Sequence, residues 1–396
     1  MRTQVAIIGG GPSGLLLAQL LQKDGIDAIV LERRSRSYVE SRIRAGVLET
    51  GFADLMREAG VAARLDREGL THDGVILSYD DDQVRIDFSH LAGKTVTVYG
   101  QTEVTRDLYA AREATGGSTL FEVEDVELHD LDTDRPRVTF MHDGQSRVID
   151  CDFVAGCDGF HGIARAAVPP AALTLYERVY PFAWLGILAE APPASEELVY
   201  ARHAEGFALF SMRSPAITRL YLQCDPEETI EAWPDARVWE ALHRRLEDDG
   251  GWRLNEGPVL QKGVTAMRSF VAEPLRFGRL FLAGDAAHIV PPTGAKGMNL
   301  AVADVRVLAA ALVAWYREGR RDLLDAYSAT CLRRVWKVQR FSWWMTQLLH
   351  RFPEEDGVQA RLQLAELDYV TSSEAGARAL AENYVGLPFE AKDGVA

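Results

Sequence analysis

Residues 5–14 read Val-Ala-Ile-Ile-Gly-Gly-Gly-Pro-Ser-Gly, an apolar run that leads into a glycine-rich turn. Gly9, Gly11 and Gly14 fit the pattern G-x-G-x-x-G. The first glycine of this pattern allows a tight turn, the second lets a pyrophosphate approach the backbone, and the third lets a helix pack on the strand. The start of that helix offers free N–H groups and the positive end of its dipole to phosphates. The stretch therefore predicts a strand, a turn and a helix around a dinucleotide.

The second strand of this unit strengthens the prediction. The apolar run 28–31 ends at Glu32, where a carboxylate can accept hydrogen bonds from a ribose diol. Strand, glycine turn, helix, strand and acid thus fall within the first 32 residues. An ordinary strand–helix turn is the alternative. Because Glu32 suits the ribose of FAD and of NAD, the motif alone leaves the choice of cofactor open.

Composition bounds the size and class of the protein. The chain has 396 residues, of which 47% are hydrophobic and 26% are charged, which is enough for a large core and two or three subdomains. Its 58 acidic and 43 basic residues give a net charge of −15. This balance argues against a nucleic-acid partner, and the lack of a polybasic tract argues against a membrane surface. An anionic substrate or cofactor must then be bound by local arginines.

The cysteines and histidines suggest neither a redox pair nor a metal site. Cys151, Cys157, Cys224 and Cys331 form no C-x-x-C motif, so we expect buried thiols in a reducing, cytoplasmic compartment. The nine histidines are scattered without metal-ligand spacing. The chain enters its first strand directly, so we expect no signal peptide. No uncharged apolar stretch approaches the ~20 residues that a membrane helix needs.

Periodic patterns indicate a mixed α/β fold whose texture changes after Tyr180. Helices are expected over 15–23, 49–59, 104–114, 236–246 and 323–349, and short strands over 75–77, 84–88, 95–99, 121–126, 138–141 and 280–283. Strands rich in aromatic and branched residues follow over 182–188, 198–203, 206–213 and 219–224. Their spacing favours an antiparallel sheet and hence a second domain. From Asn299 onward the pattern is mainly helical.

Two further motifs combine an aspartate with glycines. Residues 278–288 read Gly-Arg-Leu-Phe-Leu-Ala-Gly-Asp-Ala-Ala-His, an apolar strand that delivers Asp285 onto a turn. A carboxylate there can bind a sugar-alcohol chain, and the glycines let the backbone approach a flat ring. Residues 158–165 read Asp-Gly-Phe-His-Gly-Ile-Ala-Arg, in which Arg165 can meet a phosphate or pair with Asp158. A plain turn with an ion pair is an equal alternative for this second motif.

Together, the glycine fingerprint and the two aspartate turns resemble the single-component flavoprotein aromatic hydroxylases. The family commonly has a serine where this chain has Gly162, so that element departs from the broad pattern. Within this family, the chain most resembles the members that act on 4-hydroxybenzoate. This resemblance extends over essentially the whole chain and includes Gly162. The stretches that carry this narrower likeness are 42–47, 99–106, 157–162, 286–294 and 382–388.

The resemblance implies a Rossmann-like FAD-binding domain, an inserted antiparallel-sheet substrate domain and a helical C-terminal region. The FAD-binding domain would comprise residues 1–73, 97–175 and 267–330, and the substrate domain residues 74–96 and 176–266. Residues 331–396, rich in aromatic side chains, would form the helical region and the interface of a homodimer.

The resemblance also implies two cofactors. FAD would be held by Gly9, Gly11, Ser13, Gly14, Glu32, Arg42, Ile43, Arg44, Ala45, Gly46, Val47, Gln101, Asp285, Met298 and Asn299. NADPH would bind transiently at the surface, with contacts from Arg33, Tyr38, His161, Arg165 and Arg268. A helix after Glu32 would carry Arg33, Arg34 and Arg36, which suit a 2′-phosphate. A solvated basic face is the alternative for that cluster.

The strands 206–213 and 219–224 alternate polar and apolar side chains, so one face of their hairpin carries Arg213 and Arg219. A half-exposed sheet with its polar side in water explains this pattern. A lid that binds a carboxylate through the planar fork of an arginine explains it too. The resemblance assigns carboxylate binding to Arg213, with Ser211, Met212 and Tyr221 around it, and flavin positioning to Arg219.

Hydroxylation of a phenol ring is easier for the phenolate, and free phenols of this kind have a pKa of about 10. A tyrosine hydroxyl can accept the proton and stabilise the oxyanion. The resemblance places Tyr200 beside the substrate hydroxyl, Tyr384 behind it and His72 at the outer end of a proton relay. As alternatives, Tyr200 could simply pack in a strand, Tyr384 could anchor the C-terminal segment, and His72 could be a surface residue. The carbonyl of Pro292 would contact the same hydroxyl, with Thr293 as its neighbour.

The expected reaction is the FAD-dependent conversion of 4-hydroxybenzoate to 3,4-dihydroxybenzoate with NADPH and O2, through a flavin C4a-hydroperoxide, in aromatic degradation. Another ring acid, such as 3-hydroxybenzoate or 3,4-dihydroxybenzoate, is the second hypothesis. A flavin-binding sensor without turnover is the third. The paired tyrosines with Pro292 favour a hydroxyl opposite the carboxylate.

Overall fold

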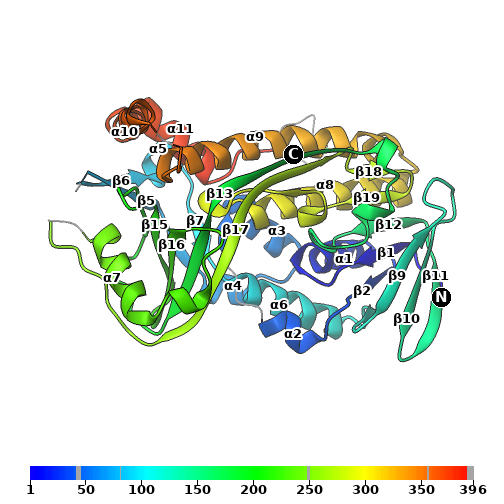
Figure 1. Ribbon diagram of the computed structural model, residues 1–396. Coiled ribbons are helices and arrows are strands. Elements are labelled where there is room, and N and C mark those ends of the chain that lie inside the picture. Colours follow the sequence, from blue (N-terminus) through cyan, green and yellow to red (C-terminus); the bar gives the residue numbers. More distant parts are fainter. Residues whose placement is uncertain (42–45, 81, 248–249, 355, 390–396) are drawn as a thin grey trace.

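The computed structural model describes residues 1–41, 46–80, 82–247, 250–354 and 356–389 (Figure 1). Two large sheets dominate it. One is a six-stranded sheet near the N-terminus of the chain, and the other is an eight-stranded sheet. The long helices α8 (Gly297–Glu318) and α9 (Asp322–Leu349) pack against each other and lie beside both sheets in Figure 1.

The six-stranded sheet has β1 near its centre, with β12 on one side and β2 on the other, all parallel. Its strands, in spatial order, are β18 (Arg276–Phe277), β19 (Leu280–Leu282), β12 (Phe153–Gly156), β1 (Val5–Ile8), β2 (Ala28–Leu31) and β8 (Thr119–Leu120). Every residue of β1, β2 and β12 is buried, as expected for parallel strands covered on both faces. The helix α1 (Pro12–Lys23) packs against α6 (Gln101–Ala114) and α8. The Rossmann-like expectation is confirmed.

This sheet positions the expected cofactor motifs. The strands β2, β1, β12 and β19 are neighbours and run parallel, so their carboxyl ends lie along one edge. Glu32 follows β2, the glycine fingerprint follows β1, Asp158 follows β12 and Asp285 follows β19. Ligands of such sheets bind outside the carboxyl ends of the strands, where the strand order reverses.

The eight-stranded sheet contains the predicted aromatic strands. In spatial order it runs through β20 (His288–Ile289), β17 (Val259–Glu273), β13 (Thr174–Ala189), β16 (Ile217–Cys224), β15 (Ala208–Ser214), β14 (Leu198–Ala201), β5 (Gly74–Tyr79) and β6 (Asp82–Asp87). Residues alternate between buried and half-buried along β16. The buried side, which includes Phe210 and Leu222, shares a hydrophobic core with α7 (Asp235–Leu246). The two-faced hairpin predicted from the sequence is confirmed.

The long strands β13 and β17 differ from the prediction. We expected a strand from Phe182 only, but β13 begins at Thr174, and β17 pairs along it (Figure 1). The first six residues of β13 are exposed, and β17 shows no regular alternation of burial, so neither segment carries a clear strand pattern. The expected domain boundaries after residues 175 and 266 fall inside these two strands. The division into domains stays a prediction.

Smaller elements complete the fold. A three-stranded meander of β9 (Glu124–His129), β10 (Arg137–His142) and β11 (Gln145–Asp150) confirms the one predicted. A second small sheet joins β3 (Val47–Glu49), β7 (Val96–Val98) and β4 (Leu70–His72). The other helices are α2 (Arg36–Ser41), α3 (Thr50–Glu58), α4 (Ala63–Glu68), α5 (Phe88–Ala92), α10 (Gly357–Ser372) and α11 (Glu374–Tyr384). Because α2 starts at Arg36, the prediction that Arg33 and Arg34 lie on a helix is wrong.

The helix α8 accounts for the most apolar stretch of the chain. By length and composition it is the one helix, within the described ranges, that could cross a membrane, although it carries Asp304 and Arg306. Inside the protein, 72% of its apolar window is buried, as in the core helix of a globular domain. All four cysteines are buried free thiols, as predicted.

Candidate active site

Three turns meet at the carboxyl ends of the parallel strands. Gly9 has a φ of +106°, and a Cβ there would overlap the carbonyl oxygen of Cys157 at the end of β12. Gly284, on the turn after β19, has a φ of +63°, and a Cβ there would lie 3.0 Å from the hydroxyl of Ser13. At Gly14 a Cβ would overlap the carbonyl of Gly9. These contacts explain the glycines and bring the three sequence motifs into one site.

The arrangement has the shape that a dinucleotide needs. A Cβ on Gly11 would meet no atom within 4 Å, so the space before the first turn of α1 is open to a pyrophosphate. The Glu32 carboxylate accepts the backbone N–H of Gly10 and of Arg34, both at 2.8 Å. Each of its oxygens keeps a further lone pair for a ribose hydroxyl. The residues present therefore fit the adenosine half of FAD.

The turn after β12 is built around Asp158. Its Oδ2 accepts the N–H of Ala164 at 2.8 Å, while Oδ1 is buried without a hydrogen-bond partner. Burial raises the pKa of Asp158. A Cβ on Gly162 would overlap this carboxylate, so the turn as built in this chain requires glycine there.

Arg165 joins two of the turns. Its guanidinium donates to the carbonyls of Phe160 at 2.6 Å and Ala286 at 2.8 Å, so it ties the turn after β12 to the turn after β19. Within the described residues it forms no ion pair with Asp158, so the pairing considered from the sequence is not formed.

Sequence reasoning missed the residue that holds the turn after β19. Asp304 of α8 accepts the N–H of Gly284 at 3.0 Å and bonds Nε2 of His288 at 2.6 Å, and both side chains are 2% exposed. Burial opposes the charge on His288, but Asp304 outweighs it and raises the pKa of His288. A lone aspartate inside an apolar helix was the available signal. Asp285 itself is exposed, and the pair is formed by Asp304 and His288.

The remaining expected FAD residues are placed as follows. The side chain of Asn299 donates to the carbonyl of Val47 at 2.8 Å and accepts from the N–H of Glu49, so it clamps β3 to α8. A Cβ on Gly46 would overlap the carbonyl of Tyr99. Gln101 is the first residue of α6, and Met298 lies half-buried in the first turn of α8. Arg42, Ile43, Arg44 and Ala45 lie outside the described residues.

Arg213 extends from β15 of the eight-stranded sheet to the backbone that precedes α6. A Cβ on Gly100 would overlap the Arg213 guanidinium, so this group rests on the backbone at the start of α6. Burial lowers the pKa of Arg213, and Glu103 acts in the opposite direction. No carboxylate among the described residues is within bonding distance of it. A buried cation of this kind is suited to an anionic ligand.

The neighbours of Arg213 lie on β15 and on the adjacent strand β16. Ser211 pairs across the strands with Arg219, whose guanidinium lies 5.1 Å from the centre of the Tyr221 ring. The Nε of Arg219 is buried without a hydrogen-bond partner. Met212 lies between Ser211 and Arg213 on β15, beside an irregularity in the strand register. The structure therefore places Ser211, Met212 and Arg213 in succession on β15, beside the strand β16 that carries Arg219 and Tyr221, and carboxylate binding by this set stays a prediction.

A pair of buried tyrosines forms the other part of the expected substrate site. The hydroxyls of Tyr200 and Tyr384 are 2.7 Å apart, although the residues are separated by 184 positions in sequence. Each is 1% exposed, and Phe88 stacks on the Tyr384 ring at 4.9 Å. Burial raises the pKa of both, so both stay protonated at neutral pH.

His72 is at the end of β4 and is 3% exposed, so the alternative of a surface histidine is wrong. Burial lowers its pKa, against a smaller opposite effect of Asp73. Its Nδ1 is buried without a partner, and within the described residues no hydrogen bond joins it to Tyr384. Its place in a proton relay stays a prediction.

A loop with a buried lysine borders the tyrosine pair. Pro292 is exposed, and the hydroxyl of Thr293 lies 2.9 Å from that of Thr346. Lys296, which sequence reasoning missed, bonds Glu49 Oε1 at 2.7 Å and the carbonyl of Tyr384 at 2.6 Å. Burial lowers the pKa of Lys296, and Glu49 opposes that shift. A lysine in the run Thr-Gly-Ala-Lys-Gly was the only sequence signal.

Three of the expected NADPH residues lie around one ring. The guanidinium carbons of Arg165 and Arg268 are 4.9 and 4.7 Å from the centre of Phe160, and the His161 ring is 5.0 Å away. Arg33 and Tyr38 are exposed on the segment after β2.

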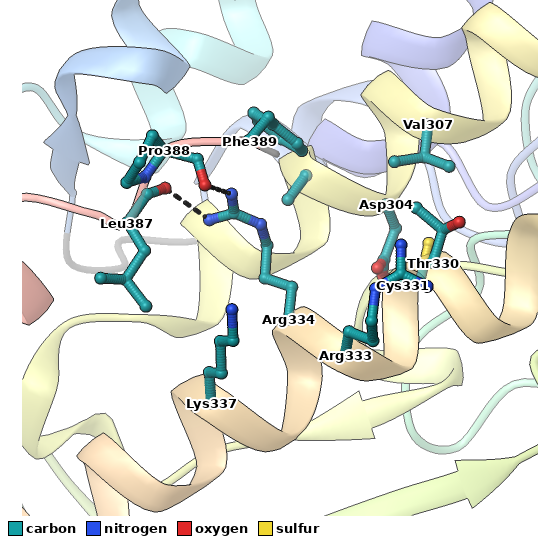
Figure 2. Close-up of a pocket in the computed structure, with 11 residues that line it drawn as sticks. Asp304, Val307, Thr330, Cys331, Arg333, Arg334, Lys337, Leu387, Pro388 and Phe389 are labelled. Atoms are coloured by element: carbon teal, nitrogen blue, oxygen red, sulfur yellow. Dashed lines mark hydrogen bonds between the residues drawn. The ribbon is translucent and has the colours of Figure 1, made fainter. Parts of the chain in front are cut away.

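Figure 2 shows a pocket between α8, α9 and the chain after α11. Arg334 donates to the carbonyls of Leu387 and Pro388, both at 2.9 Å, and so fixes that end of the chain. None of the residues expected to bind FAD or substrate lines this pocket, but Asp304, which holds the turn after β19, does, so the pocket adjoins the site through that residue.

Comparisons with known proteins agree with this geometry. Residues 2–342 match the family described as FAD binding domain. The chain is 52% identical to p-hydroxybenzoate hydroxylase of Acinetobacter baylyi, over 99% of this chain and 97% of that one. It is 27% identical to pentachlorophenol 4-monooxygenase of Sphingobium chlorophenolicum, over 82% of this chain and 60% of that one.

A solved structure shares the fold. The crystal structure of p-nitrophenol 4-monooxygenase from Pseudomonas putida superimposes with a TM-score of 0.80 at 20% identity, over 98% of this chain and 99% of that one. The fold, the fitted FAD site and the match over nearly the whole chain agree. The chain therefore belongs to the FAD-dependent aromatic hydroxylases that share this FAD binding domain.

Proposed function

We propose that this protein is an FAD-dependent monooxygenase that converts 4-hydroxybenzoate to 3,4-dihydroxybenzoate with NADPH and O2. The observation that carries the proposal is the buried Tyr200–Tyr384 hydroxyl pair, in a site whose other end offers the buried cation Arg213. The relative at 52% identity supports the same substrate.

FAD, when bound, supplies the redox chemistry, because it takes a hydride from NADPH and activates O2. The chain's own residues hold it by backbone turns. The N-terminus of α1 would hold the pyrophosphate, Glu32 would accept hydrogen bonds from the ribose, and the turn of Gly284 and Asp285 would hold the flavin half.

Arg213 orients the substrate through its carboxylate. The planar guanidinium can donate two parallel hydrogen bonds to it, and the hydroxyls of Ser211 and Tyr221 complete the set. Because the overall charge of the protein is −15, this local cation rather than the general field must attract the acid.

Tyr200 holds the substrate hydroxyl. A free phenol with a pKa of about 10 is mostly protonated at neutral pH. A protonated Tyr200, itself bonded to Tyr384, can donate to the oxygen of a phenolate and so favours its ionised form. The carbon next to that oxygen is then electron-rich, which directs hydroxylation to the ortho position.

Several finer assignments belong to the same proposal. NADPH binds at the surface through Arg33, Tyr38, His161, Arg165 and Arg268, and Arg219 positions the flavin. His72 continues the relay beyond Tyr384. Residues 1–73, 97–175 and 267–330 bind FAD, residues 74–96 and 176–266 bind the substrate, and residues 331–396 form the third region.

The protein is proposed to be a cytoplasmic homodimer. Trp336 and Trp343 of α9 are 43% and 42% exposed, which suits a contact with a second copy. Light scattering at several concentrations measures this directly. A monomer at every concentration would remove the dimer from the proposal.

Product analysis tests the reaction. The purified yellow protein is mixed with NADPH, oxygen and one of three acids: 4-hydroxybenzoate, 3-hydroxybenzoate or 3,4-dihydroxybenzoate. We expect 3,4-dihydroxybenzoate from the first acid only. A product from another acid alone would favour the second hypothesis. Ligand binding with no faster NADPH oxidation would favour a sensor.

A further inference from the structure

His350 is a fully buried histidine that no step above uses. It follows the last residue of α9, and its ring centre lies 4.4 Å from that of Phe207 and 4.7 Å from that of Phe182. Its Nε2 is 2.7 Å from Nε1 of Trp184. An indole nitrogen only donates, so Nε2 accepts, and the proton of His350 is on Nδ1, 3.1 Å from the carbonyl of Thr346. His350 is therefore a neutral imidazole held in one tautomer.

Trp184 and Phe207 support both ends of the proposed substrate pocket. The Trp184 ring lies 4.9 Å from that of Tyr221, at the carboxylate end. Phe207 stacks on Trp184 at 5.1 Å and lies 6.2 Å from Tyr200, at the hydroxyl end. In a close-packed interior a displacement of one ring displaces its neighbours. The position of His350 thus affects Tyr200 and Tyr221, the two residues on these rings that are proposed to contact the substrate.

Thr346, one helical turn before His350, holds the loop of Pro292 through Thr293. Its hydroxyl donates to the carbonyl of Ser342 at 2.7 Å and therefore accepts from the hydroxyl of Thr293 at 2.9 Å. Thr293 and Thr346 are 0% exposed. Thr293 follows Pro292, whose carbonyl is proposed to contact the substrate hydroxyl. One turn of α9 thus joins the Trp184 wall to the Pro292 loop.

We propose that His350 and Thr346 are positioning residues that set the length of the substrate pocket. The end of α9 holds Trp184 and Tyr221 at a fixed distance from the loop of Pro292. This length favours a ring acid whose hydroxyl stands opposite its carboxylate. The inference rests on the proposed function, since it takes Tyr221 as a carboxylate contact and Pro292 as a hydroxyl contact.

Two single variants separate the two ends. His350→Phe keeps an aromatic ring but leaves the buried N–H of Trp184 without an acceptor, and Thr346→Val keeps the volume but removes the acceptor of Thr293. Binding to the FAD-loaded protein is followed by flavin absorbance with 4-hydroxybenzoate, benzoate and 4-hydroxybenzamide. We expect His350→Phe to raise the dissociation constants of 4-hydroxybenzoate and benzoate, which carry a carboxylate, about tenfold. The dissociation constant of 4-hydroxybenzamide should stay unchanged. Thr346→Val should raise the dissociation constants of 4-hydroxybenzoate and 4-hydroxybenzamide, which carry a phenol hydroxyl, and leave that of benzoate unchanged.

Two further variants serve as rescue and control. The double variant Trp184→Phe/His350→Phe removes both partners, so binding of 4-hydroxybenzoate should recover toward the wild-type value. Tyr316→Phe removes hydrogen bonds to Asp152 and Gln4 in the six-stranded sheet region and controls for lost stability alone.

The outcomes are distinct. If His350→Phe and Thr346→Val lower Tm as Tyr316→Phe does but leave all three dissociation constants unchanged, or shift all three alike, the positioning role is wrong. If one variant fails to fold, the other decides by the same criterion. If the wild-type protein binds none of the three probes, the proposed function fails and the inference fails with it.

Discussion

The cofactor side and the substrate side of this site are built from different parts of the chain. On the cofactor side, backbone turns that each follow a parallel strand converge on one edge of the sheet, and Gly9 and Gly284 adopt conformations with positive φ. On the substrate side, the hydroxyl pair joins side chains 184 residues apart, from β14 and α11. A site made of local turns can be recognised in sequence, whereas a site made of distant side chains exists only after packing. The predictions below test this difference.

The largest effect is expected at the glycine fingerprint. A Cβ at Gly9 would overlap the carbonyl of Cys157 and strain a φ of +106°, so Gly9→Ala should lose both stability and FAD. A Cβ at Gly11 meets no protein atom, so Gly11→Ala should fold normally yet bind FAD about a hundredfold more weakly. Fluorescence titration with FAD and thermal unfolding of the apoprotein measure the two properties. Equal behaviour of the two variants would contradict the fit.

The next effect is expected at Arg213. Arg213→Ala removes the buried cation at the carboxylate end, so Kd for 4-hydroxybenzoate should rise by about a hundredfold. The neutral 4-hydroxybenzamide is the matched control ligand, and its Kd should change little. Flavin absorbance titrations report both constants. A similar loss for both ligands would show that Arg213 shapes the pocket rather than binds the carboxylate.

A smaller effect is expected at Asp304, a side chain on the cofactor side that lies 20 positions from the turn it supports. It tests whether the cofactor side consists of local turns alone. Asp304→Asn keeps the shape that supports Gly284 but leaves His288 without its carboxylate. FAD affinity should fall about tenfold. The folded pKa of His288 is raised, so the stability that the pair contributes is full below about pH 6.5 and is lost as pH rises through the folded pKa. The stability difference between the two proteins should therefore shrink on the alkaline side, and a difference independent of pH would contradict this.

The last prediction concerns how stability depends on pH through His350. Burial lowers its folded pKa to about 3, while an unfolded histidine titrates near 6.5. Stability is then full above about pH 6.5 and falls as pH decreases toward 3, by up to about 1.4 kcal/mol per pH unit for this one proton. His350→Phe should reduce the slope of the unfolding free energy against pH, between about pH 3 and 6.5, by the amount that corresponds to about one proton. Denaturant unfolding at several pH values measures this slope. An unchanged slope would mean that His350 is not buried and neutral in the folded protein.

Much of the fold could be predicted because its signals are local. The β1–α1–β2 unit, the meander of β9 to β11 and the alternating faces of β15 and β16 each follow from periodicity or glycine placement. The first part of β13 and all of β17 could not, since their stability comes from pairing with each other over residues far apart, and their side chains carry no alternation.

The site divides in the same way. The glycines and Glu32 could be argued from spacing alone. Tyr200, Tyr384 and Arg213 were expected only through resemblance, because no spacing rule connects β14, α11 and β15. Lys296, Asp304 and His350 could not be assigned a role from the sequence, since a lone polar residue does not reveal the partner that satisfies it after folding.

The most direct test of the substrate side is the yield of 3,4-dihydroxybenzoate per NADPH for the wild-type protein and for Tyr200→Phe. The variant keeps the ring and the packing but removes the hydroxyl that bonds Tyr384. The account predicts close to one product per NADPH for the wild type. For Tyr200→Phe it predicts continued NADPH oxidation with a product yield lower by at least about tenfold. An unchanged yield in the variant would contradict the assignment of the tyrosine pair to the substrate hydroxyl.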